Sequence, residues 1–513
     1  MDKNFYITTP IYYPSAQPHM GHAYSSIIAD FFARFKRIDG FNVHFLTGTD
    51  EHGLKIQRSA ERAGLDPQEF CDKISQTFRD LSEILNLSNT DFIRTTEDRH
   101  KKTVQNLWKE LEKNDDIYLS KYSGWYSVSD EAFYNDDEIE EVNGKKIALS
   151  SKSTVEWIEE ESYFFRLSKW EKQLLSYYQS NPDFISPESR KNEVISFVKS
   201  GLKDLSVSRK TFSWGIPVPN NNNHVIYVWL DALTNYLSAL NYPNKEDELF
   251  KKFWPASIHL IGKDILRFHA VYWPAFLLAA KIDLPKKVYG HGWILSGEEK
   301  MSKSKGNILD PLKIIKDYGL DPLRYYLIKE VSFGNDGNIS QERLEDCINS
   351  DLANNYGNLC QRVTAFASKN CDGKIPSKIK FLQEDLKILN KYKDNLNVIR
   401  EKIDEQNINF YIDYIINSLF EANKYFNDQE PWKKKDDLIR LNTIVYTALE
   451  IVRKISFLLY PIIPESSLKA LKIFNLFEKD IDIESIKDNE FLVKDKKINS
   501  IDILFKKIEK KND

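Results

Sequence analysis

The sequence predicts an α/β fold with a parallel sheet, followed by a domain built only of α-helices. In residues 1–115, and again from residue 228, short apolar and β-branched runs alternate with helical periods. This alternation is typical of parallel βαβ units. Residues 116–227 interrupt the pattern and are interpreted as an insertion. From about residue 340 apolar residues recur at helical spacing, so residues 355–513 are predicted to form an α-helical bundle.

Size and composition limit the classes of protein that need to be considered. At 513 residues and 60.0 kDa the chain is too long for one core, and several domains are expected. No apolar run or leader sequence indicates a membrane or secreted protein, so a cytoplasmic location is expected. The net charge is −4, so any nucleic acid must be bound by local basic patches. The four cysteines form no C-x-x-C pair, which argues against disulfides and structural zinc.

The first strand leads into a phosphate-binding pattern. Phe5–Thr9 is predicted to be a buried strand, and residues 25–34 have apolar residues at helical spacing. His19, Gly21 and His22 therefore lie where a strand passes into a helix. The free N–H groups and dipole of a helix N-terminus suit a phosphate, and glycine allows close approach of a ligand. Two histidines one turn apart can stabilise charge during phosphoryl or nucleotidyl transfer, although they can equally be ordinary loop histidines.

Further elements follow in order along the chain. Small residues and a carboxylate follow a second predicted strand, at the edge where α/β sheets bind ligands. The predicted helices cover about 67–86 and 97–113, with short strands at 123–134, an acidic solvated loop at 136–141 with a turn at Asn143-Gly144, and strands at 41–46, 225–230, 258–264 and 287–293. Asp310-Pro311 and Asp321-Pro322 each resemble a helix start with proline at the first helical position.

A basic run lies far downstream of the two histidines. Lys300-Met301-Ser302-Lys303-Ser304 stands between Gly297 and Gly306. Two lysines and two serines on a glycine-flanked loop are suited to clamp phosphates, although Lys-Ser runs are commonly plain solvated loops.

The two stretches read H-M-G-H and K-M-S-K-S, and together they resemble the paired signatures of class I aminoacyl-tRNA synthetases. They occur in the expected order, about 280 residues apart. Within that class the chain resembles the methionyl-tRNA synthetase family over nearly its whole length. The further matching segments are Thr9-Pro10-Ile11-Tyr12-Tyr13, Thr49-Asp50-Glu51-His52-Gly53, Trp229-Leu230-Asp231-Ala232, Gly262-Lys263-Asp264-Ile265 through His269, Trp273-Pro274, Asn358, Arg362 and Glu430-Pro431-Trp432.

The resemblance implies a fold and a domain order. It implies a Rossmann-like core whose first half is residues 1–115 and whose second half is residues 228–295, split by a connective insertion at 116–227. The K-M-S-K-S loop and a stem-contact region would occupy 296–354, and the helical anticodon-binding domain 355–513. The implied activity is methionine–tRNA ligation: methionine and ATP give methionyl-adenylate, whose methionyl group passes to the terminal adenosine of methionine tRNA, initiator or elongator.

The resemblance also implies roles for individual residues. His19, His22, Lys300 and Lys303 would be catalytic, and Gly21, Asp264, Gly292 and Met301 would complete the ATP site, with Mg²⁺ held mainly by the phosphates. The methionine site would comprise Asp50 as partner of the ammonium group, with Pro10, Ile11, Tyr13, Trp229, Ala232, Tyr236, Ile265, His269 and Trp273. Tyr13 and His269 would offer weak polar contacts to the sulfur. Asn358, Arg362 and Trp432 would read the anticodon. Each aromatic residue taken alone can instead be core packing, Trp432 included.

The sequence departs from the family pattern at two places, and two other classes of protein are alternatives to this assignment. Where many relatives carry a zinc knuckle of the form Y-C-x-x-C-E, this chain has Tyr126-Ser127-Val128-Ser129-Asp130-Glu131, so no structural zinc is expected. The chain also ends without the appended dimerising domain of some relatives, so a monomer is expected. A sister synthetase for leucine, isoleucine, valine or cysteine would need a long editing insertion or a catalytic zinc. A non-catalytic tRNA-binding relative would not need the intact signatures.

Overall fold

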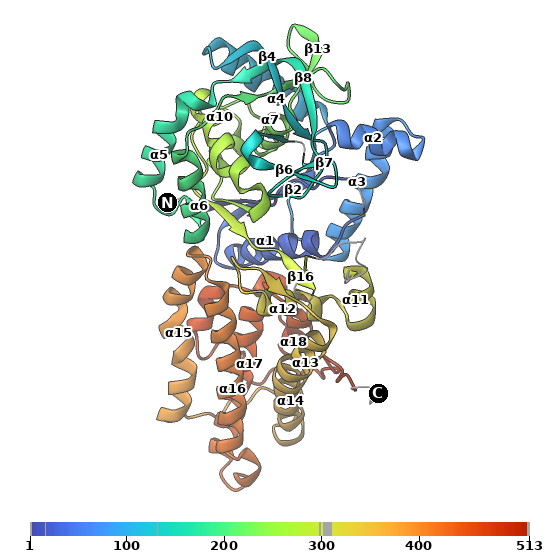
Figure 1. The fold of residues 1–513 in the computed structure, drawn as a ribbon. Helices are drawn as coiled ribbons and strands as arrows, with labels where there is room; N and C mark the ends of the chain where they lie inside the picture. Colours follow the sequence, from blue (N-terminus) through green and yellow to red (C-terminus); the bar gives the residue numbers. More distant parts are fainter. Residues whose placement is uncertain (1–2, 16, 131, 297–298, 301–309, 510–513) are drawn as a thin grey trace. The chain divides into compact units, whose positions relative to one another are not determined.

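The computed structural model describes residues 3–15, 17–130, 132–296, 299–300 and 310–509 (Figure 1). The chain divides into two compact units. The first unit combines residues 2–18 with residues 43–291, and the second combines residues 19–42 with residues 292–513. Each unit is described in turn below.

A six-stranded parallel sheet forms the centre of the first unit and confirms the predicted α/β class. The strand order is β3-β2-β1-β14-β15-β9. Ile7 of β1 is paired in register with Ile258 of β14, and β14 pairs in parallel with β15. The strands are β1 (Asn4–Thr8), β2 (Asn42–Thr49), β3 (Asp91–Arg94), β14 (Ile258–Gly262), β15 (Val288–His291) and β9 (Ile185–Ser186).

Helices cover both faces of this sheet. Neighbouring residues of β3 show the division, because successive strand side chains point to opposite faces. Ile93 joins the large buried cluster that includes Trp108 of α4 (Asp98–Lys113) and residues of α10 (Trp273–Ala279). Phe92 instead joins a small cluster with Phe78 of α3 (Pro67–Ile84), which follows α2 (Leu54–Ala63). The predicted helices at 67–86 and 97–113 are confirmed within a few residues.

One predicted strand is confirmed only at its first two residues. Residues 225–230 were expected to form a strand because the run is β-branched and aromatic. The structure ends β13 (Asn221–Ile226) there and begins the short helices α7 (Val228–Leu233) and α8 (Asn235–Ser238). The carbonyl of Tyr227 accepts the N–H groups of Leu230 and Asp231, which closes the first helical turn. Burial of the helix within the core overrides the strand propensity of these residues.

The predicted insertion contains an antiparallel sheet and also contributes to the parallel one. The antiparallel sheet has the order β10-β8-β4-β5, with strands β10 (Leu205–Ser206), β8 (Glu156–Phe165), β4 (Ile117–Ser127) and β5 (Ala132–Tyr134). Ile185 of β9, between α5 (Glu171–Ser180) and α6 (Glu188–Lys199), pairs with Val288 of β15. Strands β11 (Ser208–Arg209) and β12 (Pro217–Val218) flank β13.

The acidic run at 136–141 is not the loop that was expected. It forms one turn of 3-10 helix, Asp136–Glu138, and then enters β6 (Ile139–Val142), which pairs with β7 (Lys145–Ala148). Asn143 and Gly144 connect these strands with φ values of 52° and 73°. Positive φ at both positions is the geometry of a tight hairpin turn, so the predicted turn is confirmed.

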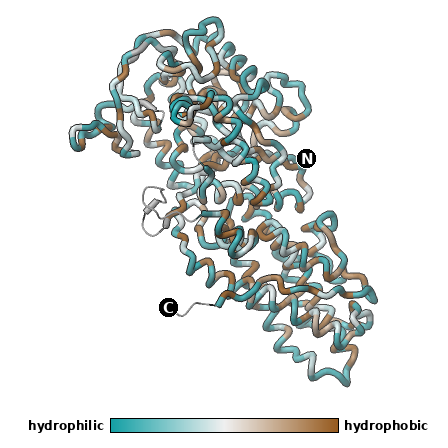
Figure 2. The backbone as a smooth tube through the Cα atoms, turned by 90° about the vertical axis from the view of Figure 1, so that its right-hand side faces the viewer, coloured by the Kyte–Doolittle hydropathy of each residue, from teal (hydrophilic) through white to brown (hydrophobic). Residues whose placement is uncertain are grey.

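The second unit is largely helical and contains the predicted bundle. Its helices are α1 (Met20–Ile38), α11 (Pro311–Tyr318), α12 (Leu320–Glu330), α13 (Gln341–Cys347), α14 (Asn358–Asn370), α15 (Gln383–Asp404), α16 (Ile408–Asp428), α17 (Leu438–Leu459) and α18 (Pro464–Leu471). Short strands β16 (Ile294–Ser296), β17 (Glu299–Lys300) and β18 (Gly337–Asn338) form a small sheet. Apolar and polar residues alternate along the bundle helices, as amphipathic helices require (Figure 2). Among the described helices, none is long and apolar enough to cross a bilayer.

The two predicted helix starts have different outcomes. Asp310 caps α11 by accepting the N–H of Leu312 at 3.0 Å, with Pro311 at the first helical position as predicted. Helix α12 instead begins at Leu320, one residue before Asp321. The Asp321 carboxylate is buried and accepts the N–H of Ser466, so it serves a tertiary contact in place of a cap.

Buried ion pairs hold α1 against other helices of its own unit. Asp30 of α1 accepts hydrogen bonds from Arg34 at 2.7 Å and from Arg324 of α12 at 2.6 Å. Arg34 also donates to the hydroxyl of Tyr460, and Arg324 donates to the carbonyl of Ile462. Two further ion pairs join the end of α1 to α15, namely Lys36–Asp404 and Asp39–Arg400. All three residues of the Asp30 cluster are buried, so the helix is fixed by charges shielded from water.

Candidate active site

His19 and His22 cap the start of α1 reciprocally. His19 is the N-cap residue, and its Nδ1 accepts the N–H of Gly21 at 3.1 Å. The N–H of His19 donates to Nδ1 of His22 at 3.1 Å, and the two rings stack with centroids 3.8 Å apart. Burial and the neighbouring His19 lower the pKa of His22 well below its usual value. A neutral imidazole that accepts at Nδ1 carries its proton on Nε2, so Nε2–H of His22 is a hydrogen-bond donor.

Close packing against His19 also requires a glycine at position 21, in addition to the predicted approach of a ligand. A Cβ atom at this position would lie 2.9 Å from Cε1 of His19. Any larger residue would therefore push away the ring that caps the helix. Gly292 is likewise required by close packing, because a Cβ atom there would lie 2.1 Å from the carbonyl oxygen of Asn335.

The K-M-S-K-S segment is described only at its first residue. The backbone of Lys300 ends β17 and pairs with Leu295 of β16. Met301 and Lys303 lie outside the described residues. Asp264 is exposed, on the turn of 3-10 helix Lys263–Ile265 that follows β14.

Asp50 lies at the carboxyl end of β2, in the first unit. Its side chain is 6% exposed, and its N–H donates to the carbonyl of Tyr12 at 2.9 Å. Burial raises the pKa of the Tyr236 hydroxyl, and the negative charge of Asp50 raises it further. The Asp50 carboxylate and this phenol therefore influence each other electrostatically. Such a buried carboxylate beside an aromatic side chain is suited to bind the ammonium group of a ligand.

A chain of polar contacts joins the other predicted pocket residues. The hydroxyl of Tyr236 donates to Nε2 of His269 at 2.7 Å, while Nδ1–H of His269 donates to the carbonyl of Ile265 at 3.0 Å. Burial lowers the pKa of His269 to about 4, so the ring is neutral at physiological pH. Nε1–H of Trp273 donates to Nε2 of His259 at 3.3 Å. These contacts give the Tyr236 hydroxyl, the His269 ring and the Trp273 N–H partners within the protein.

The remaining predicted pocket residues surround this chain in the same unit. Trp229 stacks on Phe268 with ring centroids 3.6 Å apart and an interplanar angle of 6°. Phe268 opens a turn of π-helix that ends at Tyr272, a local widening that is frequent at functional sites. Ile11, Tyr13, Trp229 and Ile265 are partly buried against the large cluster, Ala232 is fully buried, and Pro10 is partly exposed. The hydroxyl of Tyr13 donates to the carbonyl of His52 at 2.8 Å.

Sequence reasoning missed a buried aspartate between two histidines. Asp231 of α7 is fully buried and contacts Nδ1 of His52 and Nε2 of His100, each at 2.7 Å. Burial alone would raise the pKa of the Asp231 carboxyl, but the two histidines outweigh burial and lower it. The contact fixes the segment after Asp50 to helices α4 and α7. The sequence offered Asp231 only as part of the matching segment Trp229-Leu230-Asp231-Ala232, directly after a predicted strand, and no role was assigned to it.

The three residues assigned to the anticodon face lie in the helical bundle. Asn358 opens α14, and Arg362 follows one turn later, where it donates to the side-chain oxygen of Asn427 at 2.6 Å. The ring of Trp432 is 42% exposed and lies edge-to-face with Phe426, with centroids 6.4 Å apart. The Arg362 guanidinium lies 5.6 Å from the centre of the same Phe426 ring. Phe426 therefore joins Arg362 and Trp432, although the sequence did not single it out.

The zinc-knuckle position holds a cluster of hydroxyls instead of thiols. Asp130 accepts hydrogen bonds from Ser151, Ser153 and Tyr134, and Ser127 donates to Ser153 at 2.9 Å. Burial raises the pKa of Asp130, but these hydrogen bonds outweigh burial and lower it. The donor set does not fit tetrahedral zinc. In the described part of the chain, no three His, Cys, Asp or Glu side chains are grouped to hold a metal.

Comparison with known proteins covers both units. Residues 5–364 match the family model described as tRNA synthetases class I (M), and residues 375–513 match that of the anticodon binding domain of methionyl tRNA ligase. The chain is 50% identical over 473 residues to a methionine–tRNA ligase of Brucella suis and 52% identical over 478 residues to one of Rickettsia felis, with 92% of each chain covered. The fold is similar to Mycobacterium tuberculosis methionyl-tRNA synthetase in complex with methionyl-adenylate, with a TM-score of 0.95 and 44% identity over 98% of this chain and 99% of that one.

Proposed function

The chain belongs to the methionyl-tRNA synthetases of class I, and from that premise we propose how its residues divide the work of the reaction. It is an ATP-dependent methionine–tRNA ligase. The observation that carries this function is the end-to-end match, since 92% of the chain aligns at about half identity with enzymes of that name. The non-catalytic alternative is disfavoured by the reciprocal caps of His19 and His22, which hold two rings ready at a helix N-terminus.

In the first step the methionine carboxylate attacks the α-phosphorus of ATP. A carboxylate oxygen–phosphorus bond forms, the bond to the bridging oxygen breaks, and pyrophosphate leaves. His19 and His22 act on the α-phosphate oxygens, where a neutral Nε2–H donor stabilises charge without a proton being transferred. Lys300 and Lys303 hold the departing phosphates. Magnesium, which arrives with the nucleotide, neutralises part of their charge.

Methionine is recognised by one charge and an apolar, aromatic surface. Asp50 pairs with the ammonium group. The hydroxyl of Tyr13 donates to the carbonyl of His52, and Nδ1–H of His269 donates to the carbonyl of Ile265. The two side chains that were expected to contact the sulfur therefore donate their protons to backbone carbonyls instead. The thioether therefore meets the ring faces of Trp229, Tyr236 and Trp273, which suits a polarisable and weakly accepting sulfur.

In the second step the 2′-hydroxyl of the terminal adenosine attacks the adenylate's carbonyl carbon, and AMP leaves. Trp432 stacks on an anticodon base, and Asn358 and Arg362 contact base edges from one face of α14. The enzyme works as a monomer in the cytoplasm, where translation supplies initiator and elongator methionine tRNA.

ATP–pyrophosphate exchange tests the proposal with each of the twenty amino acids in turn. Of the twenty amino acids, only methionine should support rapid exchange. If none of them supports exchange, only a tRNA-binding role is left. Asp50→Ala should weaken methionine by roughly 2–4 kcal/mol, the cost of a buried charge that loses its partner, with ATP binding largely unchanged. Equal weakening of both substrates in calorimetry would make Asp50 a structural residue.

A further inference from the structure

Glu51, the residue after Asp50, is a fully buried carboxylate surrounded by donors. Arg94 of β3 binds it with two parallel hydrogen bonds, Nε to Oε1 at 2.7 Å and Nη2 to Oε2 at 2.9 Å. Thr49, Ser75 and Thr96 donate their hydroxyls to the same two oxygens. Burial alone would raise the pKa of Glu51, but Arg94 and the hydroxyls outweigh burial and lower it. The side chain is therefore a satisfied anion at physiological pH.

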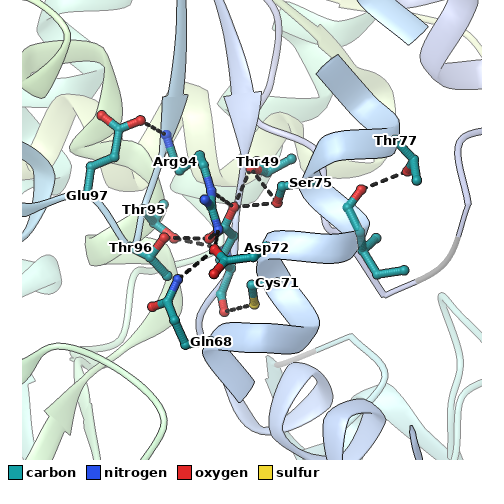
Figure 3. Close-up of polar contacts among 12 residues, drawn as sticks. Thr49, Gln68, Cys71, Asp72, Ser75, Thr77, Arg94, Thr95, Thr96 and Glu97 are labelled. Atoms are coloured by element: carbon teal, nitrogen blue, oxygen red, sulfur yellow. Dashed lines mark hydrogen bonds and ion pairs between the residues drawn. The ribbon is translucent and has the colours of Figure 1, made fainter. Parts of the chain in front are cut away.

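Three elements converge on this cluster. Figure 3 shows Arg94 reaching from its strand toward Ser75 and Asp72 of α3, with Thr95 and Thr96 on the following turn. Asp72 binds the outer side of the Arg94 guanidinium and is itself half exposed. The buried carboxylate thus links the ends of β2 and β3 to α3. None of these side chains is among those predicted to line the methionine site.

The backbone around Glu51 is fixed at successive residues. The N–H of Glu51 donates to Oγ1 of Thr95 at 2.8 Å, and its carbonyl accepts Nε1–H of Trp214 at 2.6 Å. The residue before it, Asp50, is bound through its N–H to Tyr12. Residues 50–52 follow β2 and have no regular secondary structure of their own. Their conformation therefore depends on these side-chain contacts.

We propose that the Glu51–Arg94 pair is a positioning device for methionine. By holding the backbone of residues 50–52 through the contacts of Glu51, it aims the Asp50 carboxylate at the ammonium group of the amino acid. The inference rests on the proposed role of Asp50. Small displacements of a positioned group can cost a large factor, up to about 100-fold for 1 Å, so a loosened segment should reduce methionine use strongly.

The test compares methionine with an analogue that lacks the ammonium group. Glu51→Gln keeps the size of the side chain but removes its charge, and Arg94→Met removes the fork that binds it. In exchange kinetics each variant should raise KM for methionine about tenfold or more, with KM for ATP within about twofold of the parent. The inhibition constant of 4-(methylthio)butanoate, which has no ammonium for Asp50 to bind, should stay unchanged. Arg94→Lys should restore part of the loss.

Asp72→Asn is the matched control, since it changes the exposed partner of Arg94 and leaves the buried pair intact. It should leave both KM values unchanged. If Glu51→Gln and Arg94→Met leave KM for methionine unchanged, or weaken the ammonium-free analogue and ATP equally, the pair only supports the fold and the inference is overturned. If Asp50→Asn itself leaves methionine binding unchanged, the proposed role of Asp50 fails instead. Melting temperatures measured in parallel identify any variant that does not fold.

Discussion

Replacement of Trp432 by alanine should separate the two steps of the reaction. Trp432 is 42% exposed and lies edge-to-face with Phe426, so part of the indole is accessible to a base. Pro431 precedes it, and Glu430 before that proline has a φ of 44°, in the left-handed region. A residue in that region costs free energy, as does α-like backbone before proline. This backbone strain indicates that the surrounding structure holds the Trp432 ring in one orientation.

The magnitude follows from the contact that would be lost. Stacking of a base on an aromatic side chain is worth about 1–3 kcal/mol. At about 1.4 kcal/mol per factor of ten, the loss corresponds to a fall of about fivefold to 150-fold in kcat/KM for tRNA. Trp432 is only 42% exposed, so its truncation also removes packing against Phe426, and circular dichroism must first show that the variant is folded.

Aminoacylation and methionine-dependent ATP–pyrophosphate exchange are measured on the same preparation. Aminoacylation should fall by the factor above, while exchange stays within about twofold, because exchange needs no tRNA. Trp432→Phe should recover part of the loss, and Phe477→Ala, which removes another exposed aromatic ring of the same unit, should change neither rate. A parallel fall in both reactions, or no change in either, would refute anticodon stacking by this residue.

Three further predictions concern other parts of the chain. Lys303→Ala should slow adenylate formation by about 10²–10³ while methionine binding persists, which pre-steady-state kinetics can measure. Near-normal ATP–pyrophosphate exchange would exclude a role of Lys303 at the leaving pyrophosphate. Elemental analysis should find no stoichiometric zinc, and one zinc per chain would show that the Ser127–Asp130 segment was misinterpreted. Burial and the neighbouring Arg453 lower the pKa of Lys454 to about 7. Between about pH 7 and 10 the unfolded chain therefore binds more protons than the folded chain, so the stability of the parent should rise relative to that of Lys454→Met as pH rises from 6 to 9. Each kcal/mol gained should raise the melting temperature of the parent by about 2–4 °C. A difference in melting temperature between parent and variant that stays constant over this pH range would contradict the prediction.

Local patterns predicted the elements whose local and tertiary preferences agree. The helix over α3 and the turn at Asn143-Gly144 are examples, since amphipathic spacing and turn chemistry determine both. The strand predicted from Val225 to Leu230 was wrong beyond Ile226, because its residues favour strands while their burial in the core favours a helix. Asp321 failed as a cap because its carboxylate contacts Ser466, which is distant in sequence.

The same distinction applies to the candidate site. Motifs placed Asp50, Tyr236 and His269 in one unit, and the structure finds Tyr236 and His269 in contact. What the sequence could not indicate is the direction of each proton, which depends on partners such as the carbonyl of Ile265. Glu51 stands in a run that was noted for Asp50, yet its importance became visible only through donors from β3 and α3.

The ion pairs along α1 have a consequence for dissecting the enzyme. Arg34 and Lys36 of the helix that begins after His19 contact Tyr460 and Asp404 of the bundle. Arg324, which binds Asp30 of the same helix, donates to the carbonyl of Ile462, also in the bundle. A fragment ending near residue 354 would keep both signatures but remove these contacts from Arg34, Arg324 and Lys36. Breaking a buried ionic network commonly costs about 3–5 kcal/mol, a large part of a typical folding free energy. The helical bundle is therefore not a detachable module, and an isolated catalytic fragment would need its buried arginines replaced by apolar residues before it could be expected to fold.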